Sequence, residues 1–157
     1  MIARLALALT TLTAAAIGAQ TPSPHGQHAN AAMGFDQAKT THHFYLYEDG
    51  GAIDVSVKDD SDKVNLDAIR AHLPHIAQMF AAGNFDTPML VHQRAVPGTD
   101  VMAKARDAIA YAYKETPRGG RVEITTTEAT ALAAVHTFLK FQIADHKTGD
   151  SPAIRKR

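Results

Sequence analysis

Residues 41–58 read THHFYLYEDGGAIDVSVK, and this stretch decides the fold class. Polar and apolar residues alternate before and after Gly50-Gly51, and such alternation around a Gly-Gly turn predicts a β-hairpin. In its second strand Ile53, Val55 and Val57 share one face, because successive side chains of a strand point to opposite sides. The hairpin therefore has one face to bury against another element.

A helix is expected directly after this hairpin. Residues 65–82 carry apolar side chains at helical spacing, and Gly83 ends the pattern. Pro74 lies inside the helix, where it removes a backbone hydrogen bond, so we expect a kink or a break there. Further along, residues 89–92 are predicted to form a short strand, and residues 99–107 a short helix.

The second half of the chain resembles the first. Residues 109–127 alternate around Gly119-Gly120 and predict a second hairpin, and a helix is expected from about residue 128 to 146. With the two Gly-Gly pairs superposed and a five-residue gap allowed, His72 falls on His136. This predicts a duplicated ββα unit with a pseudo-twofold axis, although two unrelated hairpin–helix units also align to some degree.

The predicted fold is α+β. We expect a two-layer sandwich in which two β-hairpins form a mostly antiparallel four-stranded sheet, with two main helices on one face. The predicted organisation is a signal peptide at residues 1–19, a flexible leader at 20–39, a single domain at 40–150 and a basic tail at 151–157 that frays.

The first 19 residues predict export. One basic residue, Arg4, precedes an uncharged stretch that ends in small residues, and we expect cleavage after Gly18 or Ala19. A retained membrane anchor is the alternative, but the stretch is shorter and more polar than the roughly 20 apolar residues that span a bilayer. A cysteine is absent near the cleavage site, which excludes a lipoprotein anchor. The expected location is the periplasm or the medium.

Composition excludes several classes of function. Without the signal, 15 basic residues stand against 16 acidic ones, and no basic stripe is present, so nucleic acid is not an expected partner. The absence of cysteine excludes disulfides, thiolate metal sites, cysteine nucleophiles and covalently attached haem. Nine histidines are the one unusual count, and histidine is a common metal ligand.

The candidate metal site starts from His72 and His75. Two histidines three positions apart lie on neighbouring positions of a helix face, from which both rings can reach one ion. Met79 and Met89 are soft donors that favour copper(I), and without a facial triad of histidines and a carboxylate, copper or zinc is favoured over iron. Ordinary core or surface histidines are the alternative. The candidate ligands are His72, His75, His136, His43, His92 and His146.

Two further groups of histidines offer weaker signals. In the strand that begins at Thr41, only one of His42 and His43 can face inward, and either is able to complete a site under the helices. In the leader, His25, His28 and Met33 form a segment that captures copper weakly, or a chance cluster.

No catalytic motif is present. The sequence lacks a Gly-x-Ser-x-Gly elbow, a His-Glu-x-x-His helix and a phosphate-binding loop. Asp145-His146 is an acid–imidazole pair only if this end of the helix is buried. We therefore expect a binding protein rather than an enzyme.

Two other functions stay open. Non-covalent haem would sit between the halves, with His72 and His136 as its axial ligands. A cofactor-free interaction module would present Tyr45, Tyr47, Tyr111 and Tyr113 on one exposed face of the sheet. The partner on that face would be another protein or, in a homodimer, a second copy of the chain.

Several segments carry a resemblance to a known family. They are MGFDQ at 33–37, KTTHHF at 39–44, DGG at 49–51, IRAHLPHI at 69–76 and FQIADHKTGD at 141–150. Together they resemble a family of small exported bacterial proteins with no established role, over about Met33 to Asp150. Such chains are sometimes labelled aspartate carbamoyltransferase, but this chain is far too short for that enzyme and lacks its Ser-Thr-Arg-Thr loop. The resemblance thus implies export and supplies no mechanism.

Overall fold

The structure, a computed structural model, describes residues 30 and 32–157. The predicted signal peptide, most of the leader, and with them His25 and His28, lie outside these residues. Phe35 is buried in the core, so the folded part begins before the first strand. A short 3₁₀-helix, η1 (Gln37–Lys39), leads into that strand.

The sheet has five strands in the order β3-β4-β2-β1-β5. The strands are β1 (Thr40–Tyr47), β2 (Gly50–Val57), β3 (Ile109–Thr116), β4 (Gly119–Thr126) and β5 (Ile154–Arg155). The α+β class and the mostly antiparallel sheet are confirmed. The predicted number of four strands is wrong, because β5 pairs parallel to β1 and makes the sheet mixed.

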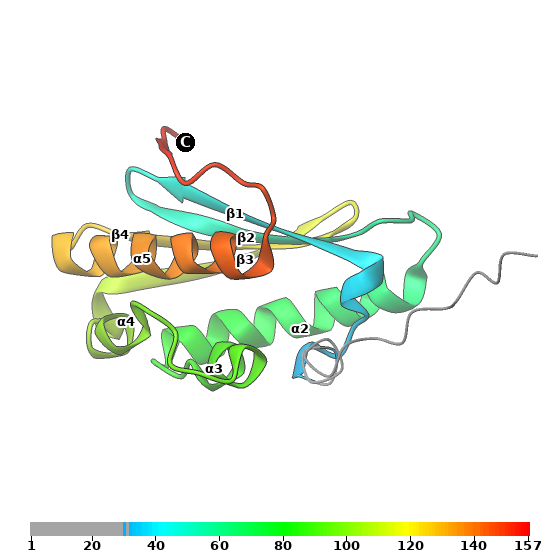
Figure 1. The fold of residues 1–157 in the computed structure, drawn as a ribbon, viewed down its shortest axis with the longest axis horizontal. Coiled ribbons are helices and arrows are strands. Elements are labelled where there is room, and N and C mark those ends of the chain that lie inside the picture. The colour runs from blue at the N-terminus through cyan, green and yellow to red at the C-terminus, as the bar shows by residue number, and fades with distance from the viewer. Residues whose placement is uncertain (1–29, 31) are drawn as a thin grey trace, which may run out of the picture.

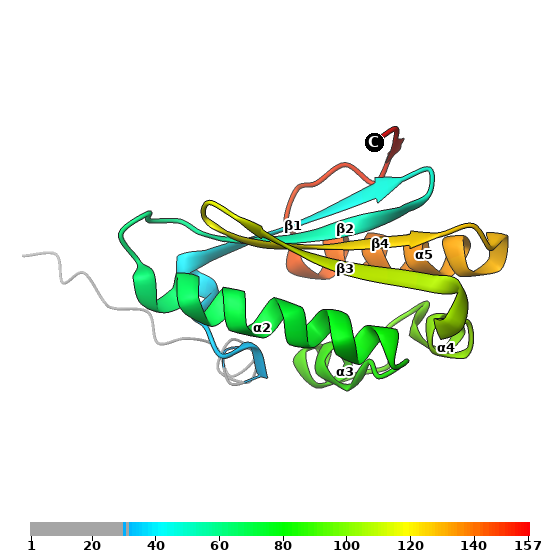
Figure 2. The ribbon, with the colours of Figure 1, turned by 180° about the vertical axis from the view of Figure 1, so that it is seen from behind.

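Four α-helices complete the described chain. They are α2 (Lys63–Ala81), α3 (Asp86–His92), α4 (Thr99–Lys104) and α5 (Ala129–His146), and a 3₁₀-helix, η2 (Arg106–Ala108), follows α4. Figures 1 and 2 show α2 and α5 along one side of the sheet. Residues 89–92, expected as a strand, belong to α3. Of the kink or break expected at Pro74, the break does not occur, because α2 continues through this residue.

The two hairpins are equal in length and meet at the centre of the sheet. Thr40 and Ile109 begin their first strands, and Gly50 and Gly119 begin their second, so both pairs are 69 positions apart. The inner strands β2 and β4 pair antiparallel, with Ile53 directly opposite Val122, which is its own counterpart at this spacing. The register is therefore the same whether it is read from the first or the second hairpin.

Each long helix packs against the strands of the other half. The helix that follows the first hairpin, α2, packs mainly on β3 and β4, whereas α5 packs mainly on β1 and β2. Inward side chains of all four long strands and of both helices form one core. Burial of this shared apolar surface holds the two halves together.

The four tyrosines do not share a face. Tyr45 and Tyr47 lie on the outer face, where the Arg121 and Arg157 guanidinium groups lie over their rings. Tyr111 faces α2 and contacts Phe80, and Tyr113 packs against the core as well. The spacing of 69 explains the error. Tyr45 corresponds to Lys114, so Tyr113 is one position out of step, and one position reverses the face of a strand. Tyr111 lies two positions before Tyr113 and therefore on the same face as Tyr113.

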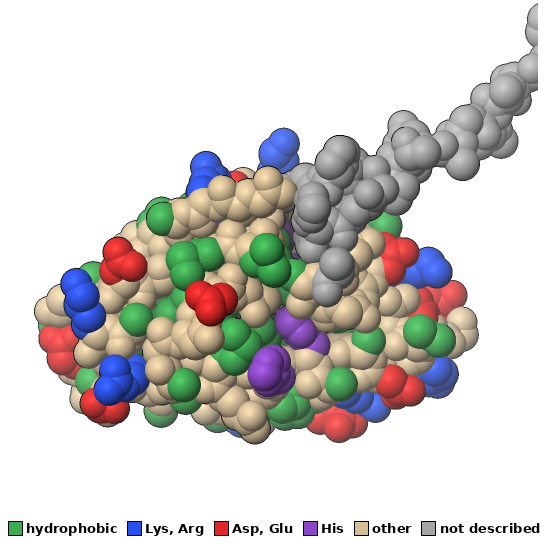
Figure 3. Space-filling view, turned by 90° about the horizontal axis from the view of Figure 1, so that it is seen from below, with side chains coloured by type: hydrophobic (Ala, Val, Ile, Leu, Met, Phe, Trp, Pro, Cys, Tyr) green, Lys and Arg blue, Asp and Glu red, His purple; other side chains and the backbone are tan. Residues whose placement is uncertain are grey.

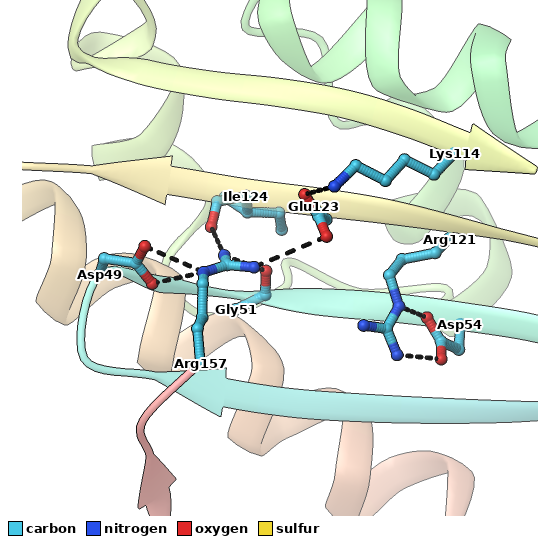
Figure 4. A network of polar contacts seen from close by, with 8 residues as sticks. All are labelled: Asp49, Gly51, Asp54, Lys114, Arg121, Glu123, Ile124 and Arg157. Atoms are coloured by element: carbon cyan, nitrogen blue, oxygen red, sulfur yellow. Dashed lines mark hydrogen bonds and ion pairs between the residues drawn. The ribbon is translucent and has the colours of Figure 1, made fainter.

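The outer face of the sheet carries a network of charges (Figure 4). Arg121 forms a two-pronged ion pair with Asp54 at 2.5 and 2.6 Å, and Lys114 binds Glu123 at 2.8 Å. Arg157 reaches both carboxylate oxygens of Asp49 at 2.8 and 2.9 Å. The tail that was expected to fray is thus attached to the sheet by β5 and by Arg157.

The glycines of the two turns permit close contact between the halves. A Cβ atom on Gly50 would lie 2.0 Å from the Ile124 carbonyl oxygen, and one on Gly119 would lie 2.0 Å from the Val55 carbonyl oxygen. We expect Gly119→Ala to lower the free energy of unfolding by about 3 kcal/mol or more, because backbone has to move. Urea denaturation measures this change.

Gly149→Ala is the matched control. Gly149 has a positive φ of +77° but open space around its Cα, so only the backbone conformation is strained. The expected loss is about 1–2 kcal/mol. A loss at Gly119 no larger than at Gly149 would show that the close contact between the strands does not limit the side chain.

Candidate functional site

A small cavity lies between the inner face of the sheet and the helices. Its volume is about 60 Å³, and its walls are apolar apart from a few polar side chains. Among the described residues four histidines line it, each from a different element: His42 from β1, His72 from α2, His92 from α3 and His146 from α5. Seen from the helix side in Figure 3, histidine side chains reach the surface among hydrophobic ones.

Three of these rings are close neighbours. The ring centroids of His42 and His146 are 5.5 Å apart, and those of His146 and His92 are 5.0 Å apart. His72 contacts Phe35, which also stacks on His42. The histidines therefore form a continuous cluster in which His146 is central and His72 lies at the side next to Phe35.

Burial keeps two of the histidines neutral. Desolvation, followed by repulsion from His146, His72 and His43, lowers the pKa of His42 to about 3. Desolvation, with repulsion from His75, lowers the pKa of His72 to about 4. His42 as a residue is partly exposed, but its Nε2 atom is buried and has no hydrogen-bond partner among the described residues. At neutral pH this nitrogen is a buried atom without a bonding partner.

His92 is held in place from both sides. Its Nδ1 lies 2.6 Å from Asp145 Oδ2, and its Nε2 lies 3.0 Å from Gln142 Oε1. Asp145 also receives a short hydrogen bond from Arg94. Burial acts to raise the pKa of Asp145, but His92 and Arg94 outweigh it and hold that pKa below its usual value. Asp145 therefore forms an acid–imidazole pair with His92.

The remaining predicted ligands point elsewhere. His75 is exposed, because the buried stripe of α2 passes through Leu73 and Ile76 and leaves position 75 on the solvent side. His136 Nε2 lies 2.9 Å from the Tyr47 carbonyl oxygen and 3.1 Å from that of Gly50. His43 Nδ1 lies 2.9 Å from Asp150. Of the six predicted ligands, the structure brings together three, His72, His92 and His146.

The methionine that lines the cavity is also not one of the two predicted as donors. Met79 and Met89, named as soft donors, pack against the core and do not line the cavity. Met33, which the sequence placed in the leader, lines it. Within residues 30 and 32–157, Met33 thus contributes the one thioether of the cavity wall.

The two long helices align at a different spacing from the one predicted from the sequence. The N-terminal caps of α2 and α5, Asp62 and Glu128, are 66 positions apart, and at this spacing the buried pairs Ile69/Val135 and Leu73/Leu139 coincide. His72 then corresponds to Phe138. The predicted match with His136 is wrong, because it shifts the helix by two residues and pairs buried with exposed positions.

With the corrected spacing, the histidine pair has an aromatic counterpart. His42 corresponds to Tyr111 through the strands, and His146 corresponds to Phe80 through the helices. Phe80 and Tyr111 contact each other at 5.9 Å, as His146 and His42 do at 5.5 Å. The two equivalent contacts between a helix of one half and a strand of the other therefore differ: one is an aromatic core contact, and the other is a pair of histidines.

Comparison of the chain with models of protein families, with curated proteins and with solved structures gives no match. Across residues 30 and 32–157, no helix is long and apolar enough to cross a membrane. In the same part of the chain, no three His, Asp or Glu side chains are already arranged as ligands of one metal ion. The cluster thus stands on its own geometry.

Acid is expected to destabilise the fold through this cluster. An unfolded histidine takes up a proton near its ordinary pKa of 6.5, whereas the folded chain keeps His42 neutral to about pH 3 and His72 to about pH 4. Between these values the unfolded state binds more protons. The free energy of unfolding therefore falls as pH falls below 6.5, by up to about 1.4 kcal/mol per pH unit for each histidine.

Urea denaturation of the metal-free chain between about pH 7 and pH 5 measures this slope. His42→Phe serves as the comparison, since its ring keeps the apolar packing but does not titrate. We expect a shallower slope in the variant. Equal slopes in the two proteins would contradict a neutral, buried His42.

Proposed function

We propose that this is an exported binding protein that takes up a transition-metal ion, copper or zinc, through the histidines of the cavity. The observation that carries the proposal is the ring spacing. With metal–nitrogen distances of about 2.0–2.1 Å, two imidazoles on one tetrahedral ion have centroids about 5 Å apart. The pairs His92/His146 and His146/His42 are spaced at 5.0 and 5.5 Å. The rings of the second pair are stacked at an interplanar angle of 17°, so one of them has to rotate before both direct a nitrogen at the same ion.

The protonation states also support metal binding. A metal binds the neutral imidazole, so a histidine that is protonated has to lose its proton first. The lowered pKa values of His42 and His72 keep both rings neutral at neutral pH. His42 Nε2 has no hydrogen bond to give up within the described part of the chain. The proposed ligands are His42, His92 and His146, with His72 as a fourth.

Asp145 and Gln142 prepare His92 in different ways. A carboxylate on the second nitrogen of a ligating histidine fixes the ring and raises its basicity, which is the role that Asp145 takes through Nδ1. Gln142 holds Nε2, the nitrogen that would face the ion. Metal binding thus requires the Gln142 side chain to turn away and the rings to rotate onto the ion.

The size of the cavity favours an ion over haem. A volume of about 60 Å³ is far below the roughly 300–1,000 Å³ of sites for drug-sized molecules. His136, proposed as the second axial ligand, is bound to backbone carbonyl groups of the β1–β2 turn. The cavity as it stands has room for an ion and its ligands but not for a porphyrin.

Export and duplication are parts of the same proposal. The signal-like residues 1–19 direct the chain to the periplasm, where a site without cysteine keeps its ligands in oxidising conditions. The common spacing of 69 positions between the hairpins supports an origin by duplication of a ββα unit, with the two copies together forming a two-layer domain. In that history one of the two equivalent helix–strand contacts kept an aromatic pair, Phe80 with Tyr111, and the other acquired histidines at both positions.

Two variants separate this site from the one expected from sequence. We expect His42→Phe to weaken binding of zinc or copper by more than about 10-fold. Loss of a group that only contacts a ligand already costs about 10-fold in metal affinity, and loss of a ligand itself costs more. His75→Ala is the control and is expected to bind as the unmodified chain does, because His75 is exposed and outside the cavity.

Elemental analysis of the chain purified from the periplasm, with calorimetric titration of each ion, gives stoichiometry and affinity. One ion per chain is expected. If neither elemental analysis nor titration detects bound metal, the proposed function is refuted. If His75→Ala loses binding and His42→Phe retains it, the site lies on the surface of α2 instead of in the cavity.

A further inference from the structure

We infer that the cavity selects copper(I) over zinc(II) and copper(II). The inference rests on the proposed function, because it names the ion that the histidine cluster takes. Its basis is the combination of an uncharged wall, a thioether beside the imidazoles and a small number of ready ligands at one place. Each of these three features favours a soft monovalent ion.

The first feature is the absence of charge in the wall. Among the described residues that line the cavity, none is Asp, Glu, Lys or Arg. The carboxylate of Asp145 lies behind His92, where Arg94 also binds it. In such a site no carboxylate of the described wall would neutralise the charge of a bound ion.

The consequence follows from solvation. The free energy needed to move an ion from water into an apolar site rises with the square of its charge, so a dication is penalised about four times as strongly as a monocation of equal size. Zinc sites without a carboxylate usually offset this with thiolates, and the chain has no cysteine. Copper(I) carries half the charge and loses far less hydration.

The second feature is the type of donor. Imidazole nitrogen binds several transition metals, but thioether sulfur selects copper(I). Met33 lies in the wall together with the histidines. The segment around it is held to the core by Phe35, which stacks on His42 and contacts His72. Met33 is therefore placed beside the cluster by a buried aromatic residue.

The third feature is the number of ligands. Zinc in a protein is nearly always four-coordinate and tetrahedral, whereas copper(I) also accepts linear and trigonal arrangements. The described residues contain no ready group of three acidic or histidine ligands. The closest approach is pairwise, through His146 to His42 and to His92. An ion that accepts few ligands fits such a cluster with the smallest rearrangement.

The test is competition between ions on the purified chain. Silver(I) serves as a redox-inert probe for copper(I), and zinc(II) is the competitor, with binding followed by native mass spectrometry and by titration. We expect one silver ion per chain and an affinity for silver at least 100-fold above that for zinc. Zinc binding as tight as silver binding overturns the inference and leaves the proposed function standing, whereas failure of both ions to bind overturns both.

Variants then test the two causes separately. Met33→Leu is expected to lower silver affinity at least 10-fold and to leave zinc affinity unchanged. Met89→Leu is its control, because Met89 lies outside the cavity wall, and it should change neither affinity. Equal effects of the two methionine variants would remove Met33 from the site.

Gln142→Glu changes charge with little change of shape. It places a carboxylate in the cavity wall beside His92 Nε2. We expect the ratio of silver to zinc affinity to fall at least 10-fold, mainly through tighter zinc binding. A ratio that stays the same in a variant whose circular dichroism matches the original chain would show that wall charge does not set the preference.

Discussion

The pairing of β2 with β4 is the contact on which the rest of the structure depends. It is the central pair of the four long strands, and it places Ile53 opposite Val122. The backbones approach so closely at Gly50 and Gly119 that a Cβ atom at either position would collide with the facing strand. Because the hairpins extend outward from this pair, its register sets the inward and outward faces of every strand.

The cavity follows from the way in which the helices cover the sheet. Since α5 packs on β1 and β2, its last turn brings His146 beside His42, while α2 brings Phe80 beside Tyr111. The aromatic pair fills its place as core. The smaller, polar histidine rings occupy the matching place together with His92, and their nitrogens give this side of the fold a chemistry that the other side lacks.

Charged groups are kept apart from this cavity. Arg121 with Asp54, and Arg157 with Asp49, lie on the outer face of the sheet, and Asp145 binds Arg94 behind His92. The interior next to the histidines is consequently of low polarity, which lowers the pKa of His42 by desolvation. The same low polarity disfavours a highly charged ion, so the sorting of charge and the proposed preference for copper(I) have one physical origin.

The sequence by itself determined the elements with a clear period. Alternation around Gly50-Gly51 and around residues 119–120 predicted both hairpins, and helical spacing predicted α2 and α5, because these patterns depend on neighbours along the chain. Residues 89–92 were misassigned, since a short apolar run suits a helix as well as a strand. Histidine enrichment also indicated the kind of residue in the candidate site.

Only the tertiary structure decided which histidines meet. Each long helix lies over the hairpin of the other half, so His42 and His146 become neighbours across a long stretch of chain, and spacing along one helix could not reveal it. His75 and His136, which that spacing favoured, turn to solvent and to a backbone turn. The reason is physical: local periodicity fixes the face of an element, but the packing of distant elements fixes what that face meets.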